Sequence, residues 1–193
     1  MTKSLRMTGL AAGFGLLLLL MGCGGMKIED FEGQEPTFVL EEYFAGPTKA
    51  WGWFEDRFGR VQRQFVVDMT GTVEGDVLTL DEHFVYDDGE RERRVWTLKI
   101  LPDGHYEGTA DGVLGTASGR VVGPALHWSY EFALKVGERT WNVHFDDWMI
   151  RQDDDVVINR ATVSKWGFTL GTVILFFKKP EGWQASAVDA AAS

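Results

Sequence analysis

Cysteine is almost absent from this chain of 193 residues, because Cys23 is the only one. A single cysteine excludes an internal disulfide framework and leaves no pair of thiols for redox chemistry. Histidine is scarce as well, and the spacing of the four histidines matches no zinc-binding motif. We therefore expect no metal site and no cofactor.

Long hydrophobic runs are also scarce, and we find one, which extends from Met7 to Met21 behind Lys3 and Arg6. It is too short and too close to the first residue for a comfortable membrane span. A short basic region followed by such a run is typical of a secretory signal peptide. We therefore predict a signal peptide over residues 1–22.

The end of this run predicts a lipid anchor. Leu20-Met21-Gly22-Cys23 resembles a bacterial lipobox, in which Met21 is an unusual occupant. An uncleaved signal anchor is the alternative. We predict that Cys23 becomes the first mature residue and carries acyl chains, since two or more chains anchor a protein stably. Gly24 stands where an Asp would signal inner-membrane retention, so we expect the outer membrane, with the domain facing the periplasm.

Basic side chains are in deficit, because 19 Lys and Arg face 29 Asp and Glu, for a formal net charge of −10. Phosphate backbones and anionic lipid head groups repel such a surface. We expect no nucleic-acid partner. We also expect membrane contact to come from the acyl chains on Cys23 rather than from a basic patch. The oligomeric state is left open.

Alternating apolar residues dominate the rest of the chain, most clearly on both sides of the turn Asp87-Asp88-Gly89. Period-two alternation around a Gly-containing turn predicts an antiparallel hairpin. The alternating residues are Leu78, Leu80, Phe84, Tyr86, Trp96, Leu98 and Ile100.

The register of this hairpin follows from the length of its turn. A three-residue turn places Leu80 opposite Trp96, and it places Glu82 opposite Arg94 on the apolar face. A two-residue turn would place Leu80 opposite Thr97 and mix apolar with polar residues on one face. We therefore predict the three-residue turn, with Gly89 in the left-handed conformation.

Similar segments recur along the chain, with no convincing amphipathic helix between them. They favour an all-β fold, either an antiparallel up-and-down barrel or a sandwich, and frequent turns favour the barrel. This domain would span residues 36–179, after a lipidated tether at 23–35 and before a disordered tail at 180–193. We expect roughly ten strands from the segments Thr37–Phe44, Lys49–Asp56, Val61–Thr72, Asp76–Tyr86, Glu90–Leu101, His105–Val113, Thr116–Val122, Ala125–Val136, Arg139–Arg151, Val156–Lys165 and Phe168–Lys178.

Small residues gather on one face of two neighbouring strands. Such residues leave room inside a barrel wall and let it bend. Either large aromatic side chains from the opposite wall or a ligand would fill this room. The residues are Gly108, Ala110 and Gly112 in the first strand and Gly115, Ala117, Gly119, Val121 and Gly123 in the second.

Seven motifs carry a resemblance to a known family. They are F-E-G-Q-E-P at 31–36, A-W-G-W-F-E-D-R-F-G at 50–59, L-D-E-H-F-V-Y-D-D-G at 80–89, R-V-W at 94–96, F-D-D-W-M at 145–149, I-N-R-A at 158–161 and S-K-W-G at 164–167. From Phe31 to Lys179 the chain resembles the domain-of-unknown-function 3833 family of proteobacterial lipoproteins. The resemblance implies a lipocalin-like barrel, and it favours an apolar ligand because genes of that family often lie near lipid-modifying enzymes. It assigns no activity.

Glu82 and Arg94 are the first candidates for a binding site, because the predicted register places both on the apolar face. Each desolvated charge would need the other. Either the pair fixes the register of the strands, or Arg94 binds the carboxylate or phosphate head of a ligand. Trp96 lies on the same face and would belong to the aromatic wall around an apolar tail.

Asp147 and Arg160 are the second candidates. Asp147 lies on the apolar face of its strand, opposite the face of His144 and Asp146, and Arg160 in the next strand could reach either Asp. Such a pair would be a buried ion pair or part of a site shared with Glu82. Acid–base catalysis needs two titratable groups near one substrate, which these carboxylates and His144 could supply.

Three functional hypotheses remain. The favoured one is a non-enzymatic carrier of a small apolar or amphipathic molecule, such as a fatty acid or lipid. The second is a lipid-modifying enzyme that uses the inward-facing carboxylates, although the chain lacks a G-x-S-x-G motif and a dinucleotide-binding loop. The third is a structural or adaptor lipoprotein with a filled barrel and an exposed aromatic patch at Trp51 and Trp53. An interior cavity would exclude the third hypothesis, and convergence of at least two carboxylates in that cavity would favour the second.

Overall fold

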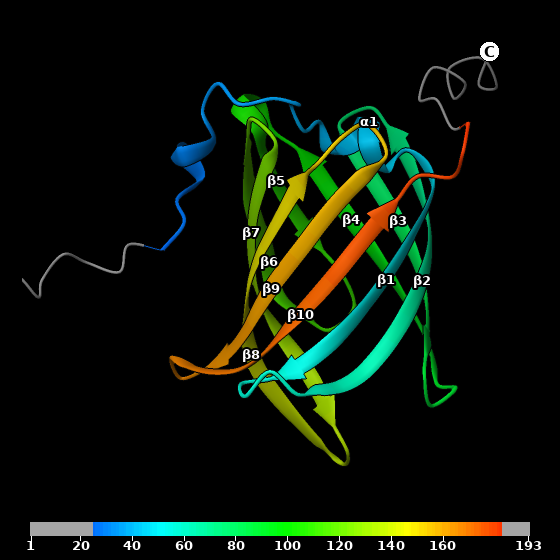
Figure 1. Cartoon of the computed structure of the whole chain (residues 1–193), viewed down its shortest axis with the longest axis vertical. Helices are drawn as coiled ribbons and strands as arrows, with labels where there is room; N and C mark the ends of the chain where they lie inside the picture. The colour runs from blue at the N-terminus through cyan, green and yellow to red at the C-terminus, as the bar shows by residue number, and fades with distance from the viewer. Residues whose placement is uncertain (1–24, 183–193) are drawn as a thin grey trace, which may run out of the picture.

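The computed structural model describes residues 25–182, which form one antiparallel barrel (Figure 1). The predicted signal peptide, Cys23 and most of the predicted tail lie outside the described residues. No helix in residues 25–182 is long and apolar enough to cross a membrane. The described elements are η1 (Ile28–Phe31), α1 (Leu40–Phe44), β1 (Gly46–Asp56), β2 (Val61–Glu74), β3 (Val77–Tyr86), β4 (Arg91–Ile100), η2 (Pro102–Gly104), β5 (His105–Thr109), β6 (Val113–Val122), β7 (Ala125–Val136), β8 (Arg139–Arg151), β9 (Val156–Lys165) and β10 (Phe168–Lys178).

The strands follow one another around the barrel in sequence order, and β1 closes it by pairing with β10. This arrangement confirms the predicted up-and-down barrel of about ten strands. Closure removes the open sheet edges that such a β-rich chain would otherwise present. β5 ends earlier than predicted, at Thr109, because Gly112 adopts a φ of 88° in the following turn.

The hairpin of β3 and β4 has the predicted register. Leu80 lies opposite Trp96, and Glu82 lies opposite Arg94. Gly89 has a φ of 85°, the left-handed conformation that the three-residue turn requires. Leu80 and Trp96 are buried, so this face of the hairpin forms part of the inner wall.

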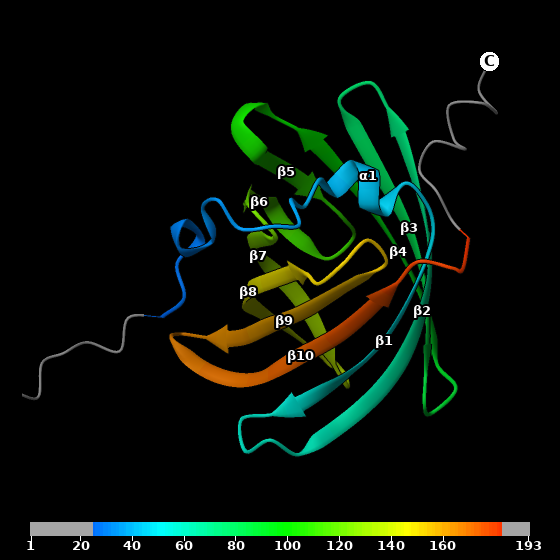
Figure 2. The ribbon, with the colours of Figure 1, turned by 45° about the horizontal axis from the view of Figure 1, so that its top comes forward.

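A short helix closes one end of the barrel. The predicted strand from Thr37 to Phe44 is wrong, because its second half forms α1. Leu40, Tyr43 and Phe44 are buried, and their i, i+3, i+4 spacing places them on one helical face. Phe44 packs edge-on against Phe177 of β10, with ring centroids 5.6 Å apart. Figure 2 shows α1 lying across the end of the barrel.

The small residues of β5 and β6 make room for aromatic rings from β7. A Cβ at Gly108 or Gly119 would collide with Trp128, and a Cβ at Gly112 would collide with Phe132. Protein interiors are close-packed, so a ring fills the space that a missing side chain leaves. Aromatic side chains therefore occupy this side of the interior, but they come from β7, which pairs with β6, and not from the opposite wall as expected.

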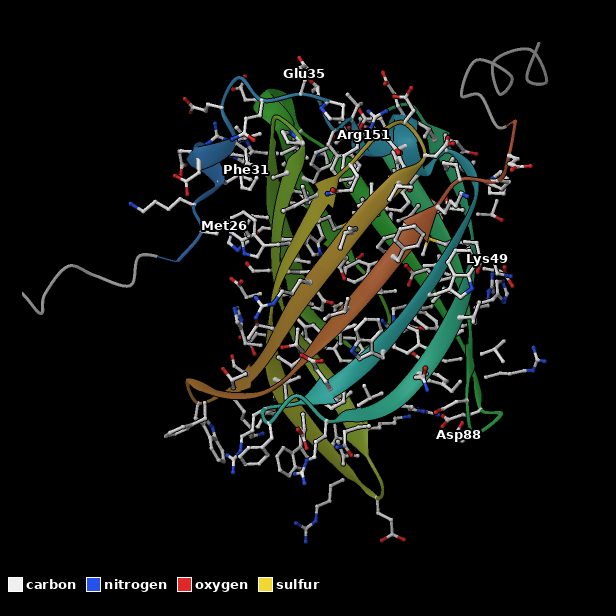
Figure 3. The ribbon with its side chains drawn as sticks, viewed as in Figure 1. Met26, Phe31, Glu35, Lys49, Asp88 and Arg151 are labelled. Carbon is white, nitrogen blue, oxygen red and sulfur yellow. The ribbon has the colours of Figure 1, made fainter. Side chains whose placement is uncertain are left out.

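The segment before α1 packs on the outside of the barrel. The ring of Phe31 lies 6.2 Å from that of Trp148, and Gly123 lies directly against the Phe31 carbonyl. Figure 3 shows Met26 and Phe31 beside the barrel wall. The predicted tether is therefore docked on the barrel over part of its length.

Candidate functional site

A cavity of about 490 Å³ lies inside the barrel. Leu40 and Phe44 of α1 line it at one end, and Gln62, Arg63 and Lys135 line it toward the other end, its mouth. Pockets that hold small molecules have volumes of roughly 300–1,000 Å³. The filled barrel of the adaptor hypothesis is therefore wrong, although Trp51 and Trp53 are exposed on the outer wall.

Away from the mouth, five polar side chains interrupt an otherwise mostly apolar and aromatic wall. They come from five strands, so closure of the barrel brings them to one cavity. Three of them were predicted from the sequence, and two were missed. We name them the polar belt: Glu82 of β3, Arg94 of β4, Tyr130 of β7, Asp147 of β8 and Asn159 of β9.

Arg94 forms its ion pair with Glu92 rather than with Glu82, which corrects the predicted pairing. Its Nη2 donates to Glu92 Oε1 at 2.6 Å, and the Tyr86 hydroxyl donates to the same carboxylate at 2.8 Å. The guanidinium also lies about 5 Å from the rings of Phe84 and Phe132 (5.1 and 5.0 Å). Burial opposes the charge of Arg94, but Glu82 and Glu92 raise its pKa above the usual value.

Arg94 has hydrogen-bonding capacity to spare. A guanidinium carries five N–H donors, and Glu92 is its one side-chain acceptor among residues 25–182. The Nε of Arg94 is buried without a hydrogen-bond partner in the described chain. A buried donor without a partner is costly, so an acceptor brought into the cavity would be favourable.

Glu82 faces the cavity with no ion pair or side-chain hydrogen bond to the described residues. Burial raises the pKa of its carboxyl to about 7; Arg94 opposes this shift, while Glu92 and Asp147 add to it. A carboxyl group with this pKa gains and loses its proton near neutral pH. Glu82 can therefore donate a hydrogen bond when protonated and accept one when ionised.

Asp147 has a similar pKa for a related reason. Only 6% of the residue is exposed, and burial raises the pKa of its carboxyl to about 7 against the hydrogen bond from Asn159. The same Asn159 Nδ2 lies 3.2 Å from the Trp148 carbonyl oxygen. Asn159 thereby holds Asp147 in place on the neighbouring strand.

Tyr130 completes the polar belt. Its ring stacks on Phe145 with centroids 4.9 Å apart, and it meets Trp96 edge-on at 5.3 Å. Burial and the charge of Asp147 raise the pKa of its hydroxyl well above the usual value. Tyr130 therefore stays protonated and offers the cavity a neutral hydroxyl.

Comparisons with known proteins agree with this architecture. The model of a family described as a protein of unknown function, DUF3833, matches residues 17–179. The chain belongs to this family. Among solved structures, this DUF3833 chain is similar to the S-type phycobiliprotein lyase CPES from Guillardia theta, with a TM-score of 0.55 and 9% identity over 82% of this chain and 95% of that chain. At this identity the likeness shows the barrel fold alone. A search of curated proteins found no match.

The predicted site residues of this DUF3833 chain do not all meet. Glu82, Arg94, Trp96 and Asp147 line one cavity. Arg160 does not, because it is exposed on the outer face of β9, opposite Trp148 of β8. The expected buried pair of Arg160 with Asp146 or Asp147 is therefore wrong. His144 also lies outside, where its Nδ1 is 2.9 Å from Glu131.

Proposed function

We propose that this protein binds a small amphipathic molecule, such as a fatty acid or another lipid, inside its barrel. The aromatic and aliphatic wall would bury an apolar tail, which is favourable by about 25 cal/mol per Å² of surface removed from water. The polar belt would hold the head group. The observation that carries the proposal is Arg94, a guanidinium with unused donors in a mostly apolar cavity.

The chemistry of the polar belt favours an acidic head group. Arg94 would donate to a carboxylate or phosphate, as guanidinium groups commonly do. Glu82 and Asp147 would add donors when protonated, which their pKa values of about 7 allow at and below neutral pH. We therefore expect the affinity for an anionic ligand to fall as the pH rises through about 7, because both groups then become anionic.

Palmitate binding tests this function. We expect purified chain from Gly24 onward, stripped of lipid, to take up palmitate, detected by mass spectrometry under non-denaturing conditions. Arg94→Gln should weaken binding by about tenfold or more, since a charge-assisted hydrogen bond contributes roughly 1.5–3 kcal/mol. Arg93→Gln is the matched control, because Arg93 lies on the outer face and pairs with Asp81.

Two further results decide the ligand proposal. Arg94→Lys keeps the positive charge and the pairing with Glu92, so it should fold and retain part of the affinity. Binding at the polar belt would be contradicted if the wild-type chain took up no palmitate. It would also be contradicted if Arg93→Gln and Arg94→Gln lost affinity for palmitate equally.

We also propose that the protein is anchored in the outer membrane through acyl chains on Cys23 and faces the periplasm. The lipobox-like sequence before Cys23 and the Gly at position 24 support this location. We expect the mature protein to fractionate with outer membranes and its N-terminal peptide to carry acyl chains. A Cys23→Ala chain should lose both properties, and an unmodified Cys23 in the wild type would contradict the anchor.

A lipid-modifying enzyme is the second candidate, and one observation favours it. Glu82 and Asp147 share an open cavity, and among the described residues neither pairs with an arginine. Their pKa values of about 7 suit a general acid or base near neutral pH. If the protein is such an enzyme, the wild-type chain should hydrolyse lipid esters. Glu82→Gln or Asp147→Asn should abolish this activity and leave palmitate binding intact. Turnover unaffected by both changes would refute these roles.

A further inference from the structure

Exposed apolar side chains gather at the mouth of the barrel. Phe58 is 67% exposed, Trp166 is 87% exposed and Phe168 is 72% exposed. They lie in or directly beside the β1–β2 and β9–β10 turns, and the exposed Val136 and Trp141 flank the β7–β8 turn. These three turns are consecutive around the barrel, because β1 pairs with β10 and β8 pairs with β9. We define the rim patch as Arg57, Phe58, Arg60, Val61, Lys135, Val136, Arg139, Trp141, Lys165, Trp166 and Phe168.

The charge of the rim patch and its three turns is opposite to that of the whole chain. Residues 56–61, 135–141 and 165–168 contain five basic and two acidic side chains, a net +3, whereas the chain carries −10. One of the two acids, Asp56, is engaged by the β1–β2 turn itself, where it accepts from Arg60 Nε at 3.0 Å and from the Phe58 backbone at 2.9 Å. The β3–β4 turn, which holds Asp88 (Figure 3), belongs to an acidic part of the rim.

Cations and aromatic rings alternate within the rim patch. The Arg57 guanidinium lies 4.8 Å from the centre of the Phe58 ring. Lys165 Nζ lies 4.9 Å from the Trp166 ring and 5.1 Å from the Trp141 ring. Side chains that combine an apolar body with a cationic tip suit the boundary between lipid and water.

Trp166 occupies a position that the fold alone does not favour. Its φ is 52°, in the left-handed region, and it precedes Gly167 in the two-residue turn between β9 and β10. Asn, Asp or Gly is preferred there, because other side chains strain the backbone. Because Trp166 is 87% exposed, burial of its side chain in the fold does not offset this strain. Strained and exposed residues of this kind occur at functional surfaces.

The described chain starts on the same side of the barrel as this turn. Figures 1 and 2 both show the start of the described chain and the β9–β10 turn on one side of the barrel. Cys23 precedes the described chain by a single residue, Gly24. A membrane that holds the acyl chains would therefore be on the side of Trp166 and Phe168.

We propose that the rim patch docks the mouth of the barrel on an anionic phospholipid bilayer. The rings would insert at the head-group level while the five cations meet lipid phosphates. Lys135 and Val136 line the cavity as well as the rim, so docking brings the cavity mouth to the bilayer surface. This local basic surface departs from the expectation that membrane contact comes from the acyl chains rather than from a basic patch. The docking does not depend on which molecule the cavity holds.

Vesicle sedimentation of the acyl-free chain from Gly24 onward tests the docking surface. We expect binding to vesicles of phosphatidylethanolamine and phosphatidylglycerol, and much weaker binding to phosphatidylcholine alone. Trp166→Asn should weaken binding by about tenfold or more, since it removes an aromatic ring that would insert into the bilayer, while its midpoint of thermal unfolding stays equal or rises. Val73→Asn is the control, because Val73 is an exposed apolar residue at the other end of the barrel.

Charge reversal tests the cations separately. Lys165→Glu should weaken binding by at least about fivefold, since each basic residue near an anionic surface contributes roughly 1 kcal/mol. Lys99→Glu makes the same change on the exposed face of β4 and should have a smaller effect.

The outcomes separate docking from ligand binding. Absence of binding to anionic vesicles, or equal losses in the rim variants and their controls, overturns the inference. A second result would also overturn it: the wild-type chain self-associates without vesicles, and Trp166→Asn abolishes this self-association but leaves vesicle binding unchanged. Vesicle binding by a chain that takes up no palmitate would refute the proposed ligand and leave the docking surface standing.

Discussion

Two acidic residues in the cavity lack the partners that buried charges usually have. Glu82 faces Arg94 across the hairpin, yet Glu92 receives the hydrogen bond from Arg94, and Asp147 relies on a neutral amide. Isolated buried charges are unfavourable, so the groups shift their pKa toward the neutral form instead. Stability and ligand binding should therefore both change near neutral pH.

The pH dependence of stability gives a first test. Between the usual carboxyl pKa of 4.5 and the folded value of about 7, the folded chain keeps a proton on Glu82 that the unfolded chain has released. The free energy of unfolding should therefore fall as the pH rises through this window and stay low above it. Asp147, raised from 3.8 to about 7, contributes with the same sign.

Glu82→Gln removes one of these contributions. We expect it to raise the free energy of unfolding by up to about 3 kcal/mol at about pH 8 and to bring no comparable gain at about pH 4. Urea unfolding over a series of pH values measures this difference. Glu138→Gln, in the exposed β7–β8 turn, controls for the change of residue type. If Glu82→Gln changed the free energy of unfolding equally at all pH values, the titration of Glu82 would not be the cause of the change.

At the scale of elements, the sequence predicts what alternation and turn length determine. The β3–β4 register could be derived because a one-residue slip would mix the two faces. The Arg94–Glu92 pair was missed because it joins residues of one strand, whereas the pairing rule considers residues across strands. The helix α1 was missed because five residues are too few for a clear period.

The outward position of Arg160 could not be derived for a different reason. Apolar residues occupy both faces of β9, with Ile158 on the outer face and Val157 and Val163 on the inner face. Alternation therefore does not specify the orientation of this strand. The hydrogen bond from Asn159 to Asp147 accompanies the observed orientation, and it depends on a contact between two strands that the sequence does not show.

The closing helix gives a test at this scale. A Cβ at Gly71 of β2 would overlap the carbonyl oxygen of Phe44, so Gly71→Ala should displace α1 from the end of the barrel. We expect a loss of about 2 kcal/mol or more in the free energy of unfolding, the usual cost of overpacking. Gly25→Ala is the matched control, because it has nothing within 4 Å. Equal stability of the two variants would show that α1 adjusts freely.

At the scale of the whole molecule, an unfilled cavity in a closed barrel predicts that occupancy stabilises the fold. A ligand that binds only the folded state adds about 2.7 kcal/mol at a concentration one hundred times its Kd. We expect palmitate to raise the midpoint of thermal unfolding in a concentration-dependent way, and to raise it much less in Arg94→Gln. Differential scanning calorimetry at matched pH measures both. An unchanged midpoint at saturating palmitate would contradict binding inside the barrel.

The pairing of β1 with β10 has a consequence for biogenesis. The first strand begins at Gly46 and the last ends at Lys178, so the barrel cannot close until the chain has been synthesised as far as its last strand. Contacts between such distant segments make folding slow. During that interval the strand edges of β1 and the aromatic inner wall stay accessible, and chaperones would have to shield them until the last strand arrives.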